Sequence, residues 1–155
     1  MGHTSKTVKR KKKDASIIAQ GFIKMPKGEK NINQTDIDRM TQIDYPLFSF
    51  KHLQKVSFDG DVKTKFFQDF LLRLKKYSDL GWKQMATDKQ HGYGWEYLPQ
   101  NKMKNKLPAA VTPEVRLMIL RSANDNRAMV GFREWNIYHV IFIEAIFNDI
   151  YEHSK

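Results

Sequence analysis

Residues 115–151 constrain the fold of this chain most, because three apolar segments follow one another there with only short polar turns between them. These segments are residues 115–122, 127–133 and 137–143. Residues 123–126 are small or Asx residues that favour a tight reversal, and residues 134–136 form a second short turn. Enrichment in β-branched and aromatic residues argues against a buried helix. The pattern therefore predicts a three-stranded antiparallel meander, with its last strand covered on both faces in the middle of a small sheet.

Four segments before the meander predict the rest of the domain. Residues 46–53 alternate in the manner of a strand, and residues 61–77 carry an apolar stripe at helical spacing. Residues 78–88 begin with a good N-cap and predict a second helix, and residues 95–98 suit a short strand. The sequence therefore predicts an α+β domain in residues 46–155, in which an N-terminal strand and a helical hairpin pack on a C-terminal antiparallel sheet.

The residues before this domain have a different composition. Residues 1–14 are polar and lysine-rich, so we expect a disordered basic tail. Residues 15–45 form an N-terminal arm, with an apolar run at residues 17–25 and the start of a short helix at residues 35–38 that ends near position 42. Of the net charge of +10, a share of +7 falls in residues 1–30, where nine basic side chains face two acidic ones. The tail can bind phosphates or serve only as a solvated terminus, and the sequence leaves both open. Its basic run consists of Lys9, Arg10, Lys11, Lys12 and Lys13.

Several classes of function are excluded by what the sequence lacks. Without cysteine the chain has no disulfide and no thiolate chemistry, which fits a reducing cytoplasm. It contains no Walker-type loop, no dinucleotide-binding glycine pattern, no HExxH and no GxSxG elbow. The five histidines are scattered, so we expect neither a metal site nor a cofactor. No apolar run reaches the roughly 20 residues of a membrane span, and we expect a cytoplasmic protein with no membrane partner.

The remaining candidates for function are cationic and aromatic. They are Arg121, Arg127 and Arg133 at strand ends, and Lys102, Lys104 and Lys106 on the preceding loop. Strand pairing can bring several of them to one end of the sheet, where arginine binds a phosphodiester and a ring such as Tyr151, Tyr93 or Trp95 stacks on a base. The alternative is that these arginines are ordinary strand-end side chains with ion-pair partners such as Glu114 or Glu134. For the whole set, together with the basic tail, we favour nucleic acid binding.

The meander also carries a sequence of motifs that is known from a protein family. In order, they are Leu120 and Arg121 at a strand end, Arg127 after the turn, the apolar strand 137–143, and Asp149, Ile150 and Tyr151 at the close. This order resembles the C-terminal half of the RelE/ParE toxin superfamily, whose members have a strand, a helical hairpin and a curved antiparallel sheet. The resemblance extends to residues 46–151 in layout but to residues 115–151 in motif. It departs from the family pattern at residues 144–148, where a basic pair is common, and this argues against efficient RNA cleavage.

The resemblance implies roles for individual residues. In the RNA-cleaving branch a ribose 2′-OH attacks the adjacent phosphate, a step that needs a base, a cation and an acid. Arg121 would be the phosphate clamp, Arg127 a second cationic contact, and Tyr151 a base-stacking or acid–base residue, with Lys102 or Lys104 as supporting cations. His91 is added on chemical grounds alone, because an imidazole on a loop can serve as acid or base near neutral pH.

We therefore expect a RelE-like protein that acts on RNA, free or on the ribosome, as a metal-independent mRNA endoribonuclease of a toxin–antitoxin or mobile-element system. An antitoxin protein would neutralise it by covering the basic face with acidic segments. Two other classes stay open. One is a non-catalytic nucleic-acid-binding module that uses the lysine tail and a basic sheet edge. The other is a protein-interaction domain whose apolar arm, residues 17–25, docks a partner.

Overall fold

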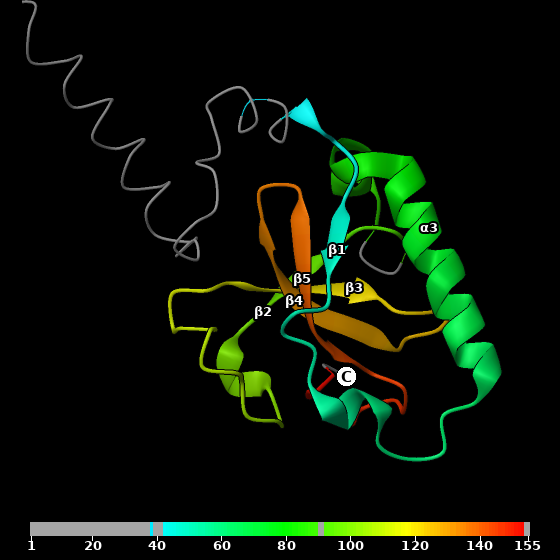
Figure 1. Ribbon diagram of the computed structural model, residues 1–155, viewed down its shortest axis with the longest axis vertical. Coiled ribbons are helices and arrows are strands. Elements are labelled where there is room, and N and C mark those ends of the chain that lie inside the picture. Colours follow the sequence, from blue (N-terminus) through cyan, green and yellow to red (C-terminus); the bar gives the residue numbers. More distant parts are fainter. Residues whose placement is uncertain (1–37, 39–41, 90–91, 154–155) are drawn as a thin grey trace, which may run out of the picture. The chain divides into compact units, whose positions relative to one another are not determined.

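The computed structural model describes residue 38, residues 42–89 and residues 92–153 (Figure 1). The predicted tail at residues 1–14, the apolar run at residues 17–25 and His91 lie outside the described residues. Of the short helix predicted to end near position 42, only residues 38 and 42 are described, and both are helical. Within the described part, no helix combines the length and the apolar character that crossing a membrane requires.

Five strands form one mixed sheet in the order β1-β5-β4-β3-β2. They are β1 (Leu47–Ser49), β2 (Glu96–Leu98), β3 (Leu117–Arg121), β4 (Ala128–Glu134) and β5 (Ile137–Ile143). The predicted meander is confirmed, since β4 pairs antiparallel with both β3 and β5. The short strand predicted at residues 95–98 is also confirmed as β2, at the edge of the sheet. The middle place belongs to β4 rather than to β5, which lies one position nearer the edge.

The first strand differs from its prediction in direction and in length. β1 runs parallel to β5, so the sheet is mixed rather than antiparallel. The prediction placed a strand over residues 46–53, but the chain turns after Ser49, and the Gln54 N–H donates a hydrogen bond to the Ile141 carbonyl at 2.8 Å. Alternation along a segment shows which side chains share a face, and it carries no information on the direction of the neighbouring strand.

One long helix, α3 (Thr64–Thr87), packs on one face of the sheet (Figure 1). Phe66, Phe70 and Tyr77 are buried at helical spacing, as the apolar stripe predicts. Leu71, also part of that stripe, is 64% exposed. The helix therefore buries a narrower face than the sequence indicates.

The predicted helical hairpin is wrong, because a single helix continues through Ser78. It kinks at Gly81, which has a φ of 77°. After the kink the Trp82 N–H donates to the Asp44 carbonyl at 2.8 Å, and the Lys83 N–H donates to the Asp44 carboxylate at 3.3 Å. A Cβ at position 81 would lie 2.5 Å from the same carboxylate. A contact with Asp44, in the segment before β1, thus fixes the kink, and glycine is required there both by its φ and by the space.

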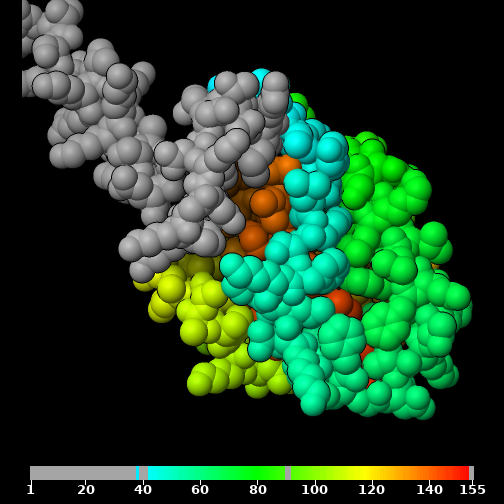
Figure 2. Space-filling view, in the orientation of Figure 1, coloured from blue at the N-terminus to red at the C-terminus, as the bar shows by residue number. Residues whose placement is uncertain are grey.

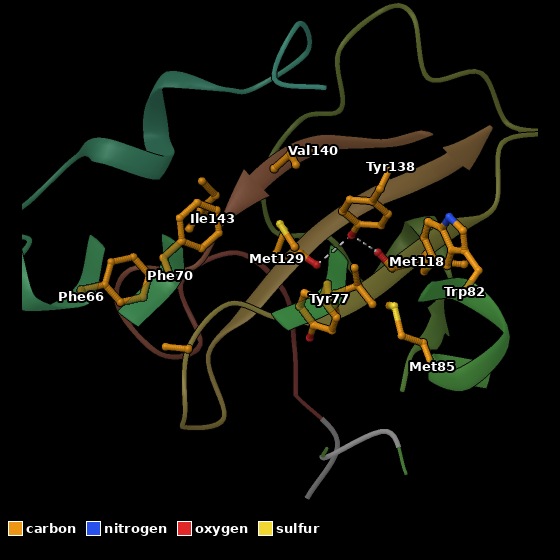
Figure 3. Close-up of a cluster of buried hydrophobic side chains, with 12 residues drawn as sticks. Phe66, Phe70, Tyr77, Trp82, Met85, Met118, Met129, Tyr138, Val140 and Ile143 are labelled. Carbon is orange, nitrogen blue, oxygen red and sulfur yellow. Dashed lines mark hydrogen bonds between the residues drawn. The ribbon is translucent and has the colours of Figure 1, made fainter. Parts of the chain in front are cut away.

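A hydrophobic core fills the space between α3 and the sheet. Tyr138 of β5 lies at its centre, and its hydroxyl donates to the Met118 and Met129 carbonyls, at 2.8 and 2.9 Å (Figure 3). Gly131 of β4 makes room for this ring, since a Cβ there would lie 2.9 Å from the Tyr138 Cζ atom. The buried members of this α3-side core are Phe66, Phe70, Tyr77, Trp82, Met85, Met118, Leu120, Ala123, Met129, Tyr138, Val140 and Ile143.

The opposite face of the sheet carries a second core. It is covered by the connection between β2 and β3, which contains the 3-10 helix η2 (Gln100–Lys102), by η1 (Lys55–Phe58) and by the C-terminal segment (Figure 1). A β-bulge in β5 turns an additional side chain to this face. Val130 pairs with Phe142 and Gly131 pairs with Val140, which leaves Ile141 as the extra residue. Ile141 and Phe142 consequently both pack in the second core.

Candidate functional site

Arg121 is held at the end of β3, on the face of the second core. Its side chain is on the same face as that of Ala128, with which it pairs across the β3–β4 hairpin. The residue is 5% exposed, and one guanidinium nitrogen donates to the Asn126 carbonyl at 2.6 Å. Its backbone N–H and carbonyl are both bonded to the Tyr77 hydroxyl of α3, at 3.0 Å each. The cation that the sequence assigns to phosphate is therefore rigidly placed and largely buried.

The C-terminal segment brings Tyr151 to the same region. Residue 151 forms an isolated antiparallel bridge with Met103. On either side, the Lys104 N–H donates to the Ile150 carbonyl at 2.9 Å, and the Glu152 N–H donates to the Lys102 carbonyl at 3.2 Å. Lys102 and Lys104 thus lie beside the segment that carries Tyr151.

A chain of side chains runs from Tyr151 to a buried carboxylate. The Tyr151 hydroxyl lies 3.2 Å from Nδ1 of His153, and Nε2 of His153 lies 2.9 and 3.0 Å from the two carboxylate oxygens of Glu144. The His153 side chain is 15% exposed, whereas that of Glu144 is fully buried. An ionised carboxylate only accepts hydrogen bonds, so Nε2 donates to Glu144, and Nδ1 shares one hydrogen with the Tyr151 hydroxyl.

Glu144 is buried with a full set of partners. Besides His153, its carboxylate accepts hydrogen bonds from the Ala128 N–H at 3.0 Å and from the Asn148 N–H at 2.7 Å. Asn148 has a positive φ of 71°, which turns the chain so that its N–H faces the carboxylate. A buried charge held by two backbone N–H groups and an imidazole fixes the position of His153.

The electrostatics of the group keep the Tyr151 hydroxyl protonated. Burial raises the pKa of Tyr151, and the negative charge of Glu144 raises it further, while Arg121 acts in the opposite direction through its charge and a side-chain hydrogen bond. The Tyr151 ring lies 4.1 Å from the His153 ring, and the Phe147 ring lies 4.3 Å from it. On the face that Figure 2 shows, a small part of the C-terminal segment, in red, is visible between the residues before α3 and α3 itself.

Arg127 does not join this group. Its guanidinium carbon lies 4.2 Å from the centre of the Phe66 ring of α3. Phe66 belongs to the α3-side core, so Arg127 lies on the face of the sheet opposite to Arg121. Asp125 binds it in an ion pair of 2.7 Å, and the Ala145 carbonyl accepts a hydrogen bond from it at 2.8 Å. Burial alone would raise the pKa of Asp125, but the hydrogen bonds and charge of Arg127 lower it. The expectation that strand pairing brings several of the basic side chains together therefore does not extend to Arg127.

Arg133 and Lys106 are also separate from the group. Arg133 pairs with Tyr138 at the other end of β4 from Ala128, and its guanidinium stacks on Trp82 at 4.0 Å. Lys106 is exposed on the connection between β2 and β3. His91 and the basic run at residues 9–13 lie outside the described residues. Among the described residues no three His, Cys, Asp or Glu side chains are grouped so that they could hold a metal ion.

Sequence reasoning missed Glu144 and His153. Both stand next to predicted features, Glu144 directly after the apolar strand and His153 two residues after Tyr151. The signal available was a lone carboxylate at the end of an otherwise apolar run, which is costly to bury unless it has partners. The scatter of the five histidines along the chain argues against a metal site, but it says nothing about an acid–base chain such as the one that contains His153.

The comparisons with known proteins find no match: no family model, no curated protein and no solved structure matches this chain. The resemblance to the RelE/ParE superfamily therefore stays a prediction that rests on the residues quoted for it.

Proposed function

We propose that this domain binds RNA and cleaves it without a metal ion, with Arg121 and Tyr151 as the groups that meet the scissile phosphate. One observation carries the proposal: the hydrogen-bonded chain from Tyr151 through His153 to the buried Glu144, beside Arg121. It supplies the acid and the cation that the reaction needs and a means of replacing the proton of the acid, while water takes the place of the base.

The chemistry follows from these groups. The ribose 2′-oxygen bonds to the adjacent phosphorus, the bond from phosphorus to the 5′-oxygen breaks, and the products are a 2′,3′-cyclic phosphate and a 5′-hydroxyl. The 2′-OH proton passes to water, and the 5′-oxygen takes a proton from the Tyr151 hydroxyl, which its raised pKa keeps protonated. His153, held by Glu144, passes a proton from solvent to Tyr151 and so restores its hydroxyl. Arg121 stabilises the negative charge that develops on the phosphate.

The direct test is cleavage of a single-stranded RNA by the purified chain and by Tyr151→Phe. Phenylalanine keeps the buried ring and removes only the hydroxyl, so we expect a folded variant whose cleavage rate is lower by about 100-fold. Lys75→Ala, on the exposed side of α3, is the matched control and should cleave as the wild type does. A Tyr151→Phe variant that cleaves at the wild-type rate would remove Tyr151 from the mechanism.

The cellular role that we propose is that of a toxin. Regulated expression in a bacterial host, with mapping of transcript ends, should give growth arrest and new 5′-hydroxyl ends that Tyr151→Phe does not give. The partner that would neutralise it is a protein with acidic segments, an antitoxin that covers the cationic surface. Expression without arrest and without new ends would contradict the toxin role.

A second candidate is a nucleic-acid-binding module without catalysis, and the burial of the site favours it. Arg121 is 5% exposed and Tyr151 3%, so RNA has to displace covering side chains before it can reach them. This candidate predicts RNA binding that weakens steeply with salt and on removal of residues 1–14, without any cleaved product. Binding that depends on neither salt nor the tail would count against it.

A further inference from the structure

Two arginines on the α3 side of the sheet have their guanidinium groups over aromatic rings. The Arg116 guanidinium carbon is 3.6 Å from the centre of the Tyr97 ring, and that of Arg133 is 4.0 Å from the Trp82 ring. Such stacking leaves the edges of the guanidinium free to donate hydrogen bonds while the ring holds its plane. Within residues 42–89 and 92–153, the Arg116 side chain has no hydrogen bond and no ion pair.

The strand register brings these side chains together. Tyr97 of β2 pairs with Met118 of β3, and Met118 pairs with Gly131 of β4. Continued by two residues, the β3–β4 pairing places Arg116 opposite Arg133. Met118 belongs to the α3-side core, and side chains two residues apart in a strand share a face, so Tyr97, Arg116 and Arg133 lie on that face.

Trp135 extends the same region. It stands in the tight turn between β4 and β5 with a φ of 59°, a conformation that L residues rarely adopt. Its side chain is 46% exposed, and that of Tyr97 is 48% exposed. The Arg133 Nε–H donates to the Trp135 carbonyl at 2.5 Å, which ties the turn to the stacked guanidinium. The turn therefore presents an indole to solvent instead of burying it.

The charge balance at this surface is positive. Asp44 is the carboxylate whose charge acts on Arg133. One of its carboxylate oxygens accepts the Lys83 N–H, and its backbone carbonyl accepts the Trp82 N–H after the kink of α3. Two guanidinium groups and two exposed rings remain for a ligand. Aromatic rings stack on nucleobases, and the edges of a guanidinium donate hydrogen bonds to phosphate oxygens. Single-stranded nucleic acid exposes both its bases and its phosphates, whereas a duplex buries its bases.

We propose that Tyr97, Arg116, Arg133 and Trp135 form a second RNA-binding surface, the aromatic–arginine surface, on which unpaired bases stack and phosphates are held. The choice of RNA as the ligand rests on the proposed function, although the residues are separate from it. Arg116 precedes β3 and Arg121 ends it, so the two sites are roughly 17 Å apart along the strand and on opposite faces. The surface holds RNA at a distance from the bond that is cut.

Fluorescence anisotropy tests this with the full chain and a labelled single-stranded oligoribonucleotide whose 2′-hydroxyls are all methylated, so that it cannot be cleaved. Arg116→Ala/Arg133→Ala and Tyr97→Ala/Trp135→Ala should each raise Kd at least 10-fold. Lys75→Ala/Lys76→Ala removes the same charge from the exposed side of α3 and should change Kd less than twofold. A double variant of the surface that binds like this control would overturn the inference.

Two further experiments test whether the ligand of the aromatic–arginine surface is unpaired RNA. Arg116→Lys/Arg133→Lys keeps the charge but not the stacked plane, and we expect it to bind as weakly as the alanine pair. A duplex of the same sequence, or poly-glutamate, that competes as well as the single strand would overturn the assignment to unpaired RNA. A wild-type chain that binds the methylated RNA but cleaves no unmodified RNA would contradict the proposed function and leave the aromatic–arginine surface standing.

Discussion

The hydroxyl of Tyr77 on α3 bonds both to the N–H and to the carbonyl of Arg121, at 3.0 Å in each case. β2 pairs with β3 only as far as Ile119, so the edge of β3 has no neighbouring strand at Arg121. The tyrosine takes the place of that strand and satisfies two buried backbone groups. The helix thereby fixes the end of the strand that carries the proposed phosphate-binding residue.

Tyr77→Phe should lower the free energy of unfolding by about 1–3 kcal/mol, because it leaves the Arg121 N–H and carbonyl buried without a partner. Urea denaturation at neutral pH measures the loss. Tyr93→Phe is the matched control: its hydroxyl has no hydrogen bond among the described residues, and we expect almost no change in stability. Equal stabilities for the two variants would contradict the role given to Tyr77.

Gly131→Ala should be among the most destabilising single substitutions in the domain. A Cβ at this position would lie 2.1 Å from the His139 carbonyl oxygen and 2.9 Å from Cζ of Tyr138, so both β5 and the central tyrosine must move. Overpacking of this kind costs typically 1–3 kcal/mol, and the backbone contact places this site at the upper end. Thermal unfolding measures the effect, and a Tm within 2 °C of the wild type, roughly what 0.5 kcal/mol would give, would contradict the expectation.

The meander could be predicted from the sequence because its evidence is local. The turn at residues 123–126 and the β-branched segments around it specify an antiparallel hairpin without reference to the rest of the chain. The kink of α3 could not be predicted in this way. It depends on Asp44, whose carbonyl and carboxylate accept the hydrogen bonds of the helix beyond Gly81.

The candidate site could be predicted only in part, because some of its residues are indicated by local sequence and others depend on the strand register. Arg121 and Tyr151 were singled out from their places at the ends of segments, and the fold brings them together. Arg127 was assigned to the same site, but the register pairs Arg121 with Ala128. A shift of one residue turns a side chain to the other face of a sheet, and Arg127 accordingly stacks on Phe66. The register between β3 and β4 depends on the whole hairpin, so the positions of the two arginines in the sequence do not predict whether their side chains share a face.

Glu144→Gln should lower the pKa of Tyr151, because the negative charge of Glu144 is one of the causes that raise it. The amide also turns an N–H₂ group towards a backbone N–H or His153, so we expect a loss of about 1–3 kcal/mol in stability. Spectroscopic titration of tyrosine ionisation isolates Tyr151 as the difference between the wild type and Tyr151→Phe, and again as the difference between Glu144→Gln and Glu144→Gln/Tyr151→Phe. Comparison of the two differences gives the change in the pKa of Tyr151. An unchanged pKa of Tyr151 would show that the charge of Glu144 does not act on Tyr151, and it would contradict the proposed proton path.

His139→Gln should make the stability of the domain less dependent on pH. Burial lowers the pKa of His139 from 6.5, His52 and Lys51 lower it further, and Glu134, 3.2 Å from Nε2, opposes them. The unfolded chain therefore binds a proton at a higher pH than the folded domain does. Stability should fall as the pH drops through about 6.5 towards the lowered folded pKa, and should not depend on this group above that range. Urea midpoints at pH 5.5, 7.0 and 8.5 measure the trend, and a variant that loses as much stability on acidification as the wild type would show that another group is responsible.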